Sequence, residues 1–175
     1  PYHVVEAEGT FRELEIMLYP TIIQGGMGVG VSNYRLARAV SKAGQLGVVS
    51  GTMLDTVLAR RLQDGDLDGL IRRAMSSFPI RELSDRVLKD YYIEGGKSPD
   101  APYKAVPMHT MCSSDALISL TILANYVEVF LAKHGHEGIV GINYLTKIEL
   151  PTLPSIFGAM LAGVDYILMG AGIPR

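Results

Sequence analysis

The chain has 175 residues, of which 16 are basic and 18 acidic, so its formal net charge is −2. A chain of this length can bury a substantial core, and a charged fraction of only 19% argues against disorder. The near-neutral balance also argues against a nucleic-acid-binding protein, which needs a basic face. A single cysteine, Cys112, excludes a disulfide scaffold and fits a reducing compartment.

No segment has the pattern of a membrane span or a signal peptide. The longest uncharged stretch, residues 16–34, contains four glycines and a proline, which is more typical of a loop than of a membrane helix. Charged residues precede any apolar run at the N-terminus. We therefore expect a cytoplasmic protein that binds neither a membrane nor a nucleic acid.

The N-terminal part of the sequence predicts a strand, a helix and a second strand. Residues 1–18 carry a weak signal and are expected to form an arm or a lead-in helix, whereas the β-branched run 21–24, ended by two glycines, predicts a buried strand. Ser32 or Asn33 can cap a helix that Gly44 would end. Its expected apolar face comprises Leu36, Ala39, Val40 and Ala43. A second strand is predicted over 46–50.

A similar unit follows near the C-terminus. Residues 138–143 predict a strand, a helix follows Pro154, and residues 166–169 predict another strand. The expected apolar face of that helix comprises Ile156, Ala159, Met160 and Gly163. Strands that alternate with helices and are apolar on both faces indicate a parallel sheet covered by helices.

The long region from Met53 to His136 separates the two units. Its pattern predicts helices at 54–63, 68–78, 80–93 and 114–133, with a polar loop over 94–107. The last of these helices is strongly apolar and should be largely buried. We interpret the region as a helical insertion, at about 53–136, in one strand-to-strand crossover.

The sharpest local motif is the glycine-rich segment 24–33, QGGMGVGVSN. Glycines between a strand and a helix let the backbone approach a flat or anionic ligand closely. The spacing departs from the dinucleotide-binding fingerprint, because Val31 or Asn33 occupies the third glycine position, and no acidic residue ends the second strand. A tight turn that binds no ligand is the alternative.

Small or polar residues end all four predicted strands. Asn143 ends the third strand, and Ser50-Gly51-Thr52 and Gly170-Ala171-Gly172 end two others. In parallel α/β folds, ligands bind at the carboxyl ends of the strands, so these segments predict one common site. The alternative for Asn143 is that its side chain caps the next turn.

Other motifs are weaker. Residues 95–98, GGKS, end like a phosphate-binding loop but are followed at once by a proline. Residues 64–69 open like a calcium-binding loop, yet its twelfth position is Met75 rather than glutamate, which favours aspartates that cap a helix. No pattern supports catalysis by Cys112 with His109 and Asp115, or a metal site at His134 and His136.

Together, these segments resemble the nitronate monooxygenase (formerly 2-nitropropane dioxygenase) family of FMN-dependent (β/α)8 barrels. The resemblance rests on segments spread over most of the chain: IIQGGMG at 22–28, GQLGVVSG at 44–51, GINYL at 141–145, GAMLAGVDY at 158–166 and GAGIP at 170–174. It implies an α/β fold of the TIM-barrel type. The related barrel enoyl-acyl-carrier-protein reductases share much of this pattern.

The resemblance also implies a cofactor site. FMN would lie across the mouth of the barrel, with Met27 and Gly28 against the isoalloxazine ring and Asn143 hydrogen-bonded toward it. The implied cofactor-binding residues are Gly26, Met27, Gly28, Ser50, Gly51, Asn143 and Gly172. The implied reaction is oxidation of an alkyl nitronate, formed from a nitroalkane, with molecular oxygen. A flavin-dependent enoyl reductase and a flavodoxin-like binding module without enzyme activity are the alternatives.

Length is the main departure from the family. A barrel of this type has eight strands and about 250 residues, whereas this sequence predicts four strands. We expect residues 1–175 to be the N-terminal part of a single barrel domain, with the catalytic histidine beyond residue 175, and to bind FMN poorly in isolation. No catalytic residue and no metal ligand are assigned. The insertion is expected to cover the mouth as a lid or to form a contact in a homodimer, and the sequence leaves both open.

Overall fold

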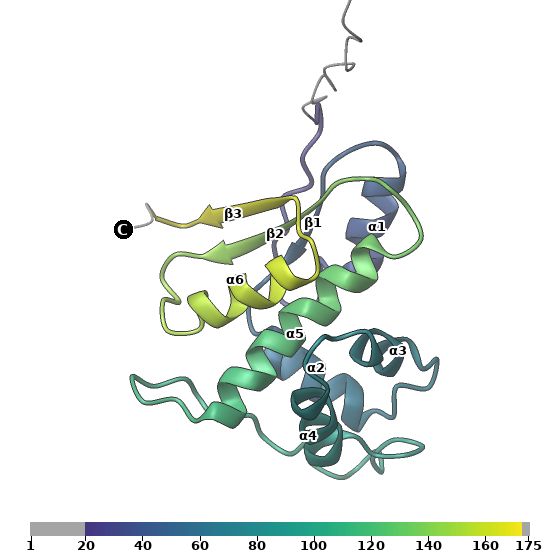
Figure 1. Ribbon diagram of the computed structural model, residues 1–175, viewed down its shortest axis with the longest axis vertical. Coiled ribbons are helices and arrows are strands. Elements are labelled where there is room, and N and C mark those ends of the chain that lie inside the picture. Colours follow the sequence, from purple (N-terminus) through teal and green to yellow (C-terminus); the bar gives the residue numbers. More distant parts are fainter. Residues whose placement is uncertain (1–19, 173–175) are drawn as a thin grey trace, which may run out of the picture.

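The computed structural model describes residues 20–172, which form a parallel three-stranded sheet with six helices (Figure 1). The strands are β1 (Gly47–Ser50), β2 (Val140–Leu145) and β3 (Tyr166–Gly170). The helices are α1 (Tyr34–Lys42), α2 (Leu54–Gln63), α3 (Leu70–Ser76), α4 (Arg81–Tyr91), α5 (Asp115–Lys133) and α6 (Thr152–Leu161). The predicted arm or lead-in helix at 1–18 lies outside the described residues.

The strands follow the order β1-β2-β3, and their register assigns each side chain to one of two faces. Val49 pairs with Ile142, and Ser50 with Asn143. Since aligned residues of parallel strands point to the same side, Val49, Ile142 and Tyr144 face the helices and belong to the main hydrophobic cluster. Ser50 and Asn143 therefore face the opposite side of the sheet.

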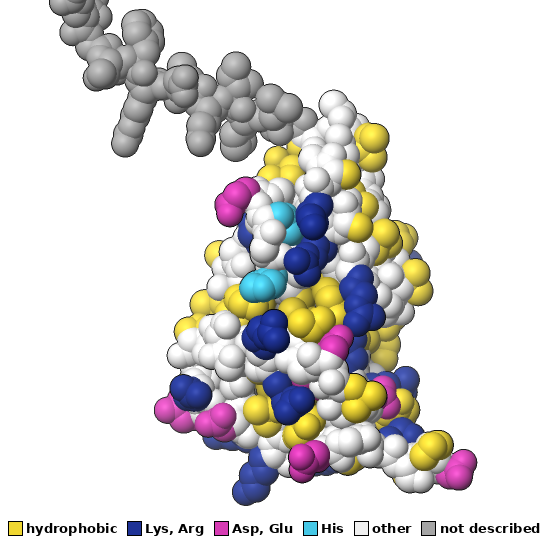
Figure 2. Space-filling view, turned by 90° about the vertical axis from the view of Figure 1, so that its right-hand side faces the viewer, with side chains coloured by type: hydrophobic (Ala, Val, Ile, Leu, Met, Phe, Trp, Pro, Cys, Tyr) yellow, Lys and Arg dark blue, Asp and Glu magenta, His cyan; other side chains and the backbone are white. Residues whose placement is uncertain are grey.

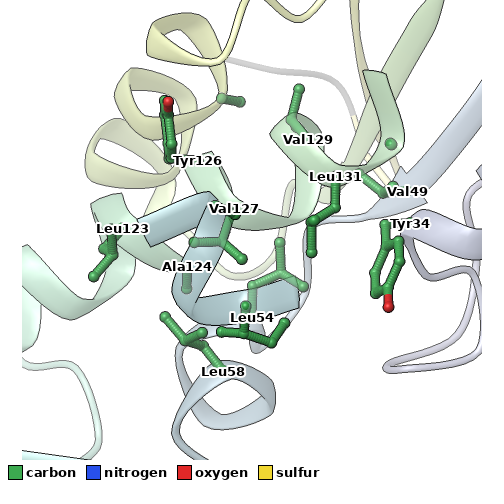
Figure 3. Packing of buried hydrophobic residues seen from close by; sticks show 14 of the residues in the cluster. Tyr34, Val49, Leu54, Leu58, Leu123, Ala124, Tyr126, Val127, Val129 and Leu131 are labelled. Carbon is green, nitrogen blue, oxygen red and sulfur yellow. The ribbon is translucent and has the colours of Figure 1, made fainter. Parts of the chain in front are cut away.

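Helix α5 is the centre of the helical layer. Most of its 19 residues are apolar, and it is capped by Ser114, whose side chain accepts a hydrogen bond from the N–H of Leu117. The other five helices all contact it, and Figure 3 shows Val127, Leu131 and neighbouring residues packed toward Leu54 and Val49. By length and composition α5 could span a membrane, but 72% of its most apolar window is buried, as expected of a core helix.

Residues 53–136 form helices where the sequence predicts them. Helix α2 has the predicted bounds, and α3, α4 and α5 each lie inside a predicted range. The calcium-like turn is a helix-capping turn: Asp66 accepts hydrogen bonds from the N–H groups of Ile71 and Arg72, and Asp68 from that of Leu70. Within residues 20–172, no cluster of potential metal ligands occurs.

Two predictions for the first strand-helix unit are wrong. Residues 21–24 form only a single parallel bridge, between Ile23 and Leu46, and Ile22 and Ile23 are exposed rather than buried, so the described part has three strands instead of four. Helix α1 is capped by Asn33 and followed by Gly44 in the left-handed region, as predicted. Its buried side chains, however, are Tyr34, Ala37 and Ser41 rather than the predicted apolar face.

Helix α6 and strand β2 also differ from the prediction in detail. Helix α6 begins at Thr152, before Pro154, and Met160 is 62% exposed. Strand β2 runs two residues past the predicted end, so Asn143 lies inside the strand rather than at its end.

On the face drawn in Figure 2, basic side chains are scattered among acidic and hydrophobic ones, without a uniformly basic surface.

Candidate active site

The glycine-rich segment crosses the sheet face on which none of the helices within residues 20–172 packs. Gly26 has a φ of +64°, and a Cβ atom there would lie 2.4 Å from Cγ1 of Val48 and 3.0 Å from Cβ of Asn143. Both the backbone conformation and this close approach require glycine. The segment therefore passes directly over β1 and β2.

Asn143 joins β2 to this segment. Its Nδ2 donates a hydrogen bond to the carbonyl oxygen of Gly25 at 2.8 Å and lies 3.5 Å from Sδ of Met27. Met27 itself is 65% exposed, so its side chain remains available to a ligand. The structure thus brings together Met27 and Asn143, which are 116 positions apart in the sequence.

The remaining predicted cofactor-binding residues lie at different distances from this contact. Ser50 is buried, and its N–H donates to the carbonyl of Ser32 at 2.8 Å, while the N–H of Gly51 donates to that of Asn143 at 2.8 Å. At β3, Gly170 approaches the Asn143 amide oxygen, with an ideal Cβ 3.7 Å away, whereas Gly172 lies against Thr146. Gly172 is therefore at the edge of the site.

The backbone of the glycine segment is open to a ligand. Among the described residues, no protein acceptor takes a hydrogen bond from the N–H groups of residues 25–30, and Met27, Val29 and Val31 are exposed. Unpaired N–H groups on a glycine-rich loop are suited to the carbonyl and phosphate oxygens of an acceptor-rich ligand. This donor set fits a flat ring with an anionic tail.

Gln24 fixes the position of this segment, a role that the sequence analysis did not assign. Its Oε1 accepts a hydrogen bond from the N–H of the fully buried Val48 at 2.9 Å, and its Nε2 donates to Oγ of Ser32 at 2.9 Å. One amide side chain thus ties both ends of the glycine segment to β1.

Replacing Gln24 with alanine is expected to lower the free energy of unfolding by about 1–3 kcal/mol, because the buried N–H of Val48 loses its acceptor. Urea unfolding followed by circular dichroism measures this. The matched control is Gln45→Ala, which removes hydrogen bonds at the exposed residues Thr21 and Ile22 and should change stability by less than about 0.5 kcal/mol. Equal effects of the two substitutions would contradict the assigned role of Gln24.

A buried ion pair anchors the start of α1, directly after the glycine segment. The side chain of Glu128, from α5, is 3% exposed; its Oε1 accepts a hydrogen bond from the N–H of Tyr34 at 2.7 Å, and Arg61 binds the carboxylate. The Arg61 guanidinium also lies 5.4 Å from the centre of the Tyr34 ring. Helices α1, α2 and α5 thereby meet at Tyr34, the first residue of α1.

A histidine–aspartate pair forms on the helix side of the sheet. Nε2 of His109 lies 3.3 Å from Oδ2 of Asp55 and 3.1 Å from Oγ1 of Thr121. Sequence reasoning tested His109 only against nearby Cys112 and Asp115, and Cys112 is an exposed free thiol. No local pattern points to a partner 54 positions earlier, because the pairing depends on how α2 and the loop before α5 fold against each other.

Tyr144, beside this pair, is a permanent hydrogen-bond donor. Burial raises its pKa, so the hydroxyl keeps its proton. The hydroxyl donates to Oδ1 of Asn125 at 3.0 Å. Asn143 and Tyr144 thus serve opposite faces of β2, the first toward the glycine segment and the second toward α5.

A comparison with family models matches residues 12–71 to the family described as Nitronate monooxygenase. That range holds the glycine segment, α1, β1 and α2. No curated protein and no solved structure matches the chain.

Proposed function

We propose that the chain, whose residues 12–71 match the nitronate monooxygenase family model, is an FMN-dependent oxidoreductase that oxidises alkyl nitronates with molecular oxygen. The family match supports an oxidoreductase that acts on a small molecule. The flavin cofactor and the nitronate substrate are the parts of this proposal that go beyond the family match.

The observation that carries the proposal is the contact between Asn143 and the glycine segment. The Asn143 amide lies within hydrogen-bond reach of Gly25, beside the exposed Met27 side chain and the unpaired N–H groups of residues 25–30. These groups are of the kinds that hold an isoalloxazine ring: a soft apolar side chain against its plane and N–H donors toward its carbonyl oxygens. When bound, FMN supplies the two-electron redox chemistry of the reaction.

The chain's own residues would bind and orient the ring. Met27 would pack against the ring, N–H groups of the glycine segment would donate to ring or phosphate oxygens, and the Asn143 side chain would hydrogen-bond toward the ring. At the end of β1, position 51 requires glycine, because a side chain there would clash with the Tyr144 ring on the helix side of the sheet. Gln24 and Glu128 hold the segment and α1 in the geometry that these contacts need.

We extend the proposal to the architecture. The three parallel strands with helices on one face are the arrangement of consecutive β/α units in a barrel, whose inner face would carry Ser50 and Asn143. Residues 1–175 would then be the N-terminal part of one FMN-binding barrel domain, with the insertion at about 53–136 on its outside.

The test uses protein expressed from the natural coding sequence that contains this chain. Flavin released by denaturation is identified by chromatography and mass spectrometry, and oxygen uptake is measured with an alkyl nitronate. We expect FMN and nitronate-dependent oxygen uptake. Oxidation of a reduced nicotinamide with an enoyl thioester, without nitronate oxidation, would indicate the reductase, and release of FAD or of no flavin would contradict the cofactor assignment.

A further inference from the structure

A large cavity opens beside the carboxyl end of β2, on the side of the sheet away from Asn143. Its volume is about 850 Å³, and it lies between α2, α5, residues 103–109 and the segment 144–155. Volumes of roughly 300–1,000 Å³ are typical of pockets that bind small organic molecules. The residues proposed to hold FMN, apart from Gly51, are not among those that line it.

Most of the wall is apolar and adaptable. Met53, Met108, Ile148 and Leu150 line the cavity and are each more than 40% exposed, although all are large hydrophobic side chains. Methionines adapt to irregular apolar ligands, because their side chains are unbranched and polarisable. Such a wall suits an alkyl chain.

The polar centre of the cavity is the Asp55–His109 pair. Each of the two side chains is 12% exposed, and both line the cavity. The imidazole is fully engaged: Nε2 faces Asp55 and Thr121, and Nδ1 lies 3.3 Å from Oγ of Ser113. It therefore has no ring nitrogen left for a ligand.

Asp55, in contrast, keeps capacity to accept hydrogen bonds. Within the described part of the chain, its carboxylate has two partners, the N–H of Thr56 at 2.6 Å and His109. A carboxylate offers about four acceptor positions. A ligand that carries a hydroxyl or an ammonium group can occupy the remaining ones, whereas a carboxylate head group would be repelled.

Three basic residues, Arg60, Lys104 and Lys147, also line the cavity. The Arg60 guanidinium lies over the ring of Tyr103, 5.2 Å from its centre, and Nζ of Lys104 donates to the carbonyl of Asp90 at 2.9 Å. Lys147 lines the cavity together with Glu149, which has the opposite charge. Two of the three cations are thus engaged with other groups.

We propose that this cavity is a second ligand site, which binds a medium-chain aliphatic molecule with a hydrogen-bond-donating head, an alcohol or an amine. The head donates to Asp55, and the chain lies against the methionine-containing wall. The site goes beyond the FMN reaction proposed above and does not depend on it.

The experiment uses the absence of tryptophan from the sequence. In the whole chain, Met108→Trp places one fluorophore at an 85% exposed position on the cavity wall, and Leu67→Trp places one at an 82% exposed position that does not line the cavity. Each protein is titrated with 1-octanol, 1-butanol, octylammonium and octanoate. We expect a saturable emission change with 1-octanol in the Met108→Trp protein and none in the Leu67→Trp protein.

Comparison of 1-octanol with 1-butanol, the alcohol series, tests the apolar wall. Comparison of 1-octanol with octylammonium and octanoate, the head-group series, tests Asp55. Each buried methylene strengthens binding about fourfold, so 1-octanol should bind at least about tenfold more tightly than 1-butanol. Octanoate should bind at least about tenfold more weakly than 1-octanol, and comparison with octylammonium shows whether an alcohol or an amine is preferred. In the Met108→Trp background, Asp55→Asn should remove most of this discrimination, whereas Asp68→Asn, at an exposed aspartate, should leave it unchanged.

Three results would overturn the proposal: no saturable change in the Met108→Trp protein, an equal change in the Leu67→Trp protein, or octanoate binding as tightly as 1-octanol. The head-group series on the Met108→Trp protein decides the question even where Asp55→Asn prevents folding. Loss of FMN binding would leave all these outcomes unaffected, because the readout involves no flavin.

Discussion

Replacing Glu128 with alanine is expected to lower the free energy of unfolding by about 3 kcal/mol, at the lower end of the usual cost of breaking a buried ion pair. The carboxylate is 3% exposed and binds both Arg61 and the N–H of Tyr34. Its loss leaves the N–H without an acceptor and the guanidinium without its counter-charge. The cost stays at the lower end because Arg61, at 25% exposure, can still reach water.

Thermal unfolding followed by circular dichroism should show a decrease in Tm of about 6–12 °C for Glu128→Ala. Glu128→Gln, which keeps an acceptor for Tyr34 but loses the charge, should have an intermediate effect. The control is Arg35→Ala, which breaks an exposed pair with Asp68 and should cost less than about 1 kcal/mol. A Glu128→Ala protein as stable as the control would show that the pair does not anchor α1.

Replacing Gly158 with alanine is the second change with a large expected effect, because it forces α5 and α6 apart. A Cβ atom at this position would lie 2.0 Å from the carbonyl oxygen of Ile122 and 2.9 Å from its carbonyl carbon. These are backbone atoms of a buried helix, so no side-chain rotation relieves the clash. Overpacking costs about 1–3 kcal/mol and occasionally more, and alanine's better helix propensity returns at most about 1 kcal/mol.

We therefore expect Gly158→Ala to lower the free energy of unfolding by about 2 kcal/mol or more in urea titrations. Met160→Ala serves as the control, because Met160 lies on the same helix but is 62% exposed and should change stability by less than about 0.5 kcal/mol. A neutral or stabilising Gly158→Ala would mean that α5 and α6 do not pack as closely as the structure shows.

Local patterns were sufficient to predict most of the elements. The β-branched runs predicted β1, β2 and β3 to within about two residues at each end, and the cap at Asn33 and the glycine after α1 were identified from single residues. These features depend on neighbours in sequence, which a pattern records. The family resemblance, confirmed over residues 12–71, rests on the same short segments.

The errors concern features that tertiary packing decides. The apolar pattern of α1 predicted that Leu36 lies on the buried face. The helix is instead oriented by Tyr34, whose N–H donates to Glu128, 94 positions away. Residues 21–24 have strand-forming composition, yet their neighbours leave them exposed and bridged at one point. The partners of Gln24 and His109 could not be predicted for the same reason, because no spacing rule relates residues that only the fold brings together.

The proposal that FMN lies on the glycine segment and Asn143 is tested most directly by nuclear magnetic resonance. The isotope-labelled chain is titrated with FMN, a method that detects even the weak binding expected of this chain alone. We predict saturable amide shifts at Gly26, Met27, Gly28, Ser50, Gly51 and Asn143, which decrease strongly in an Asn143→Ala protein. Shifts centred on another surface, or none at millimolar FMN, would contradict the account.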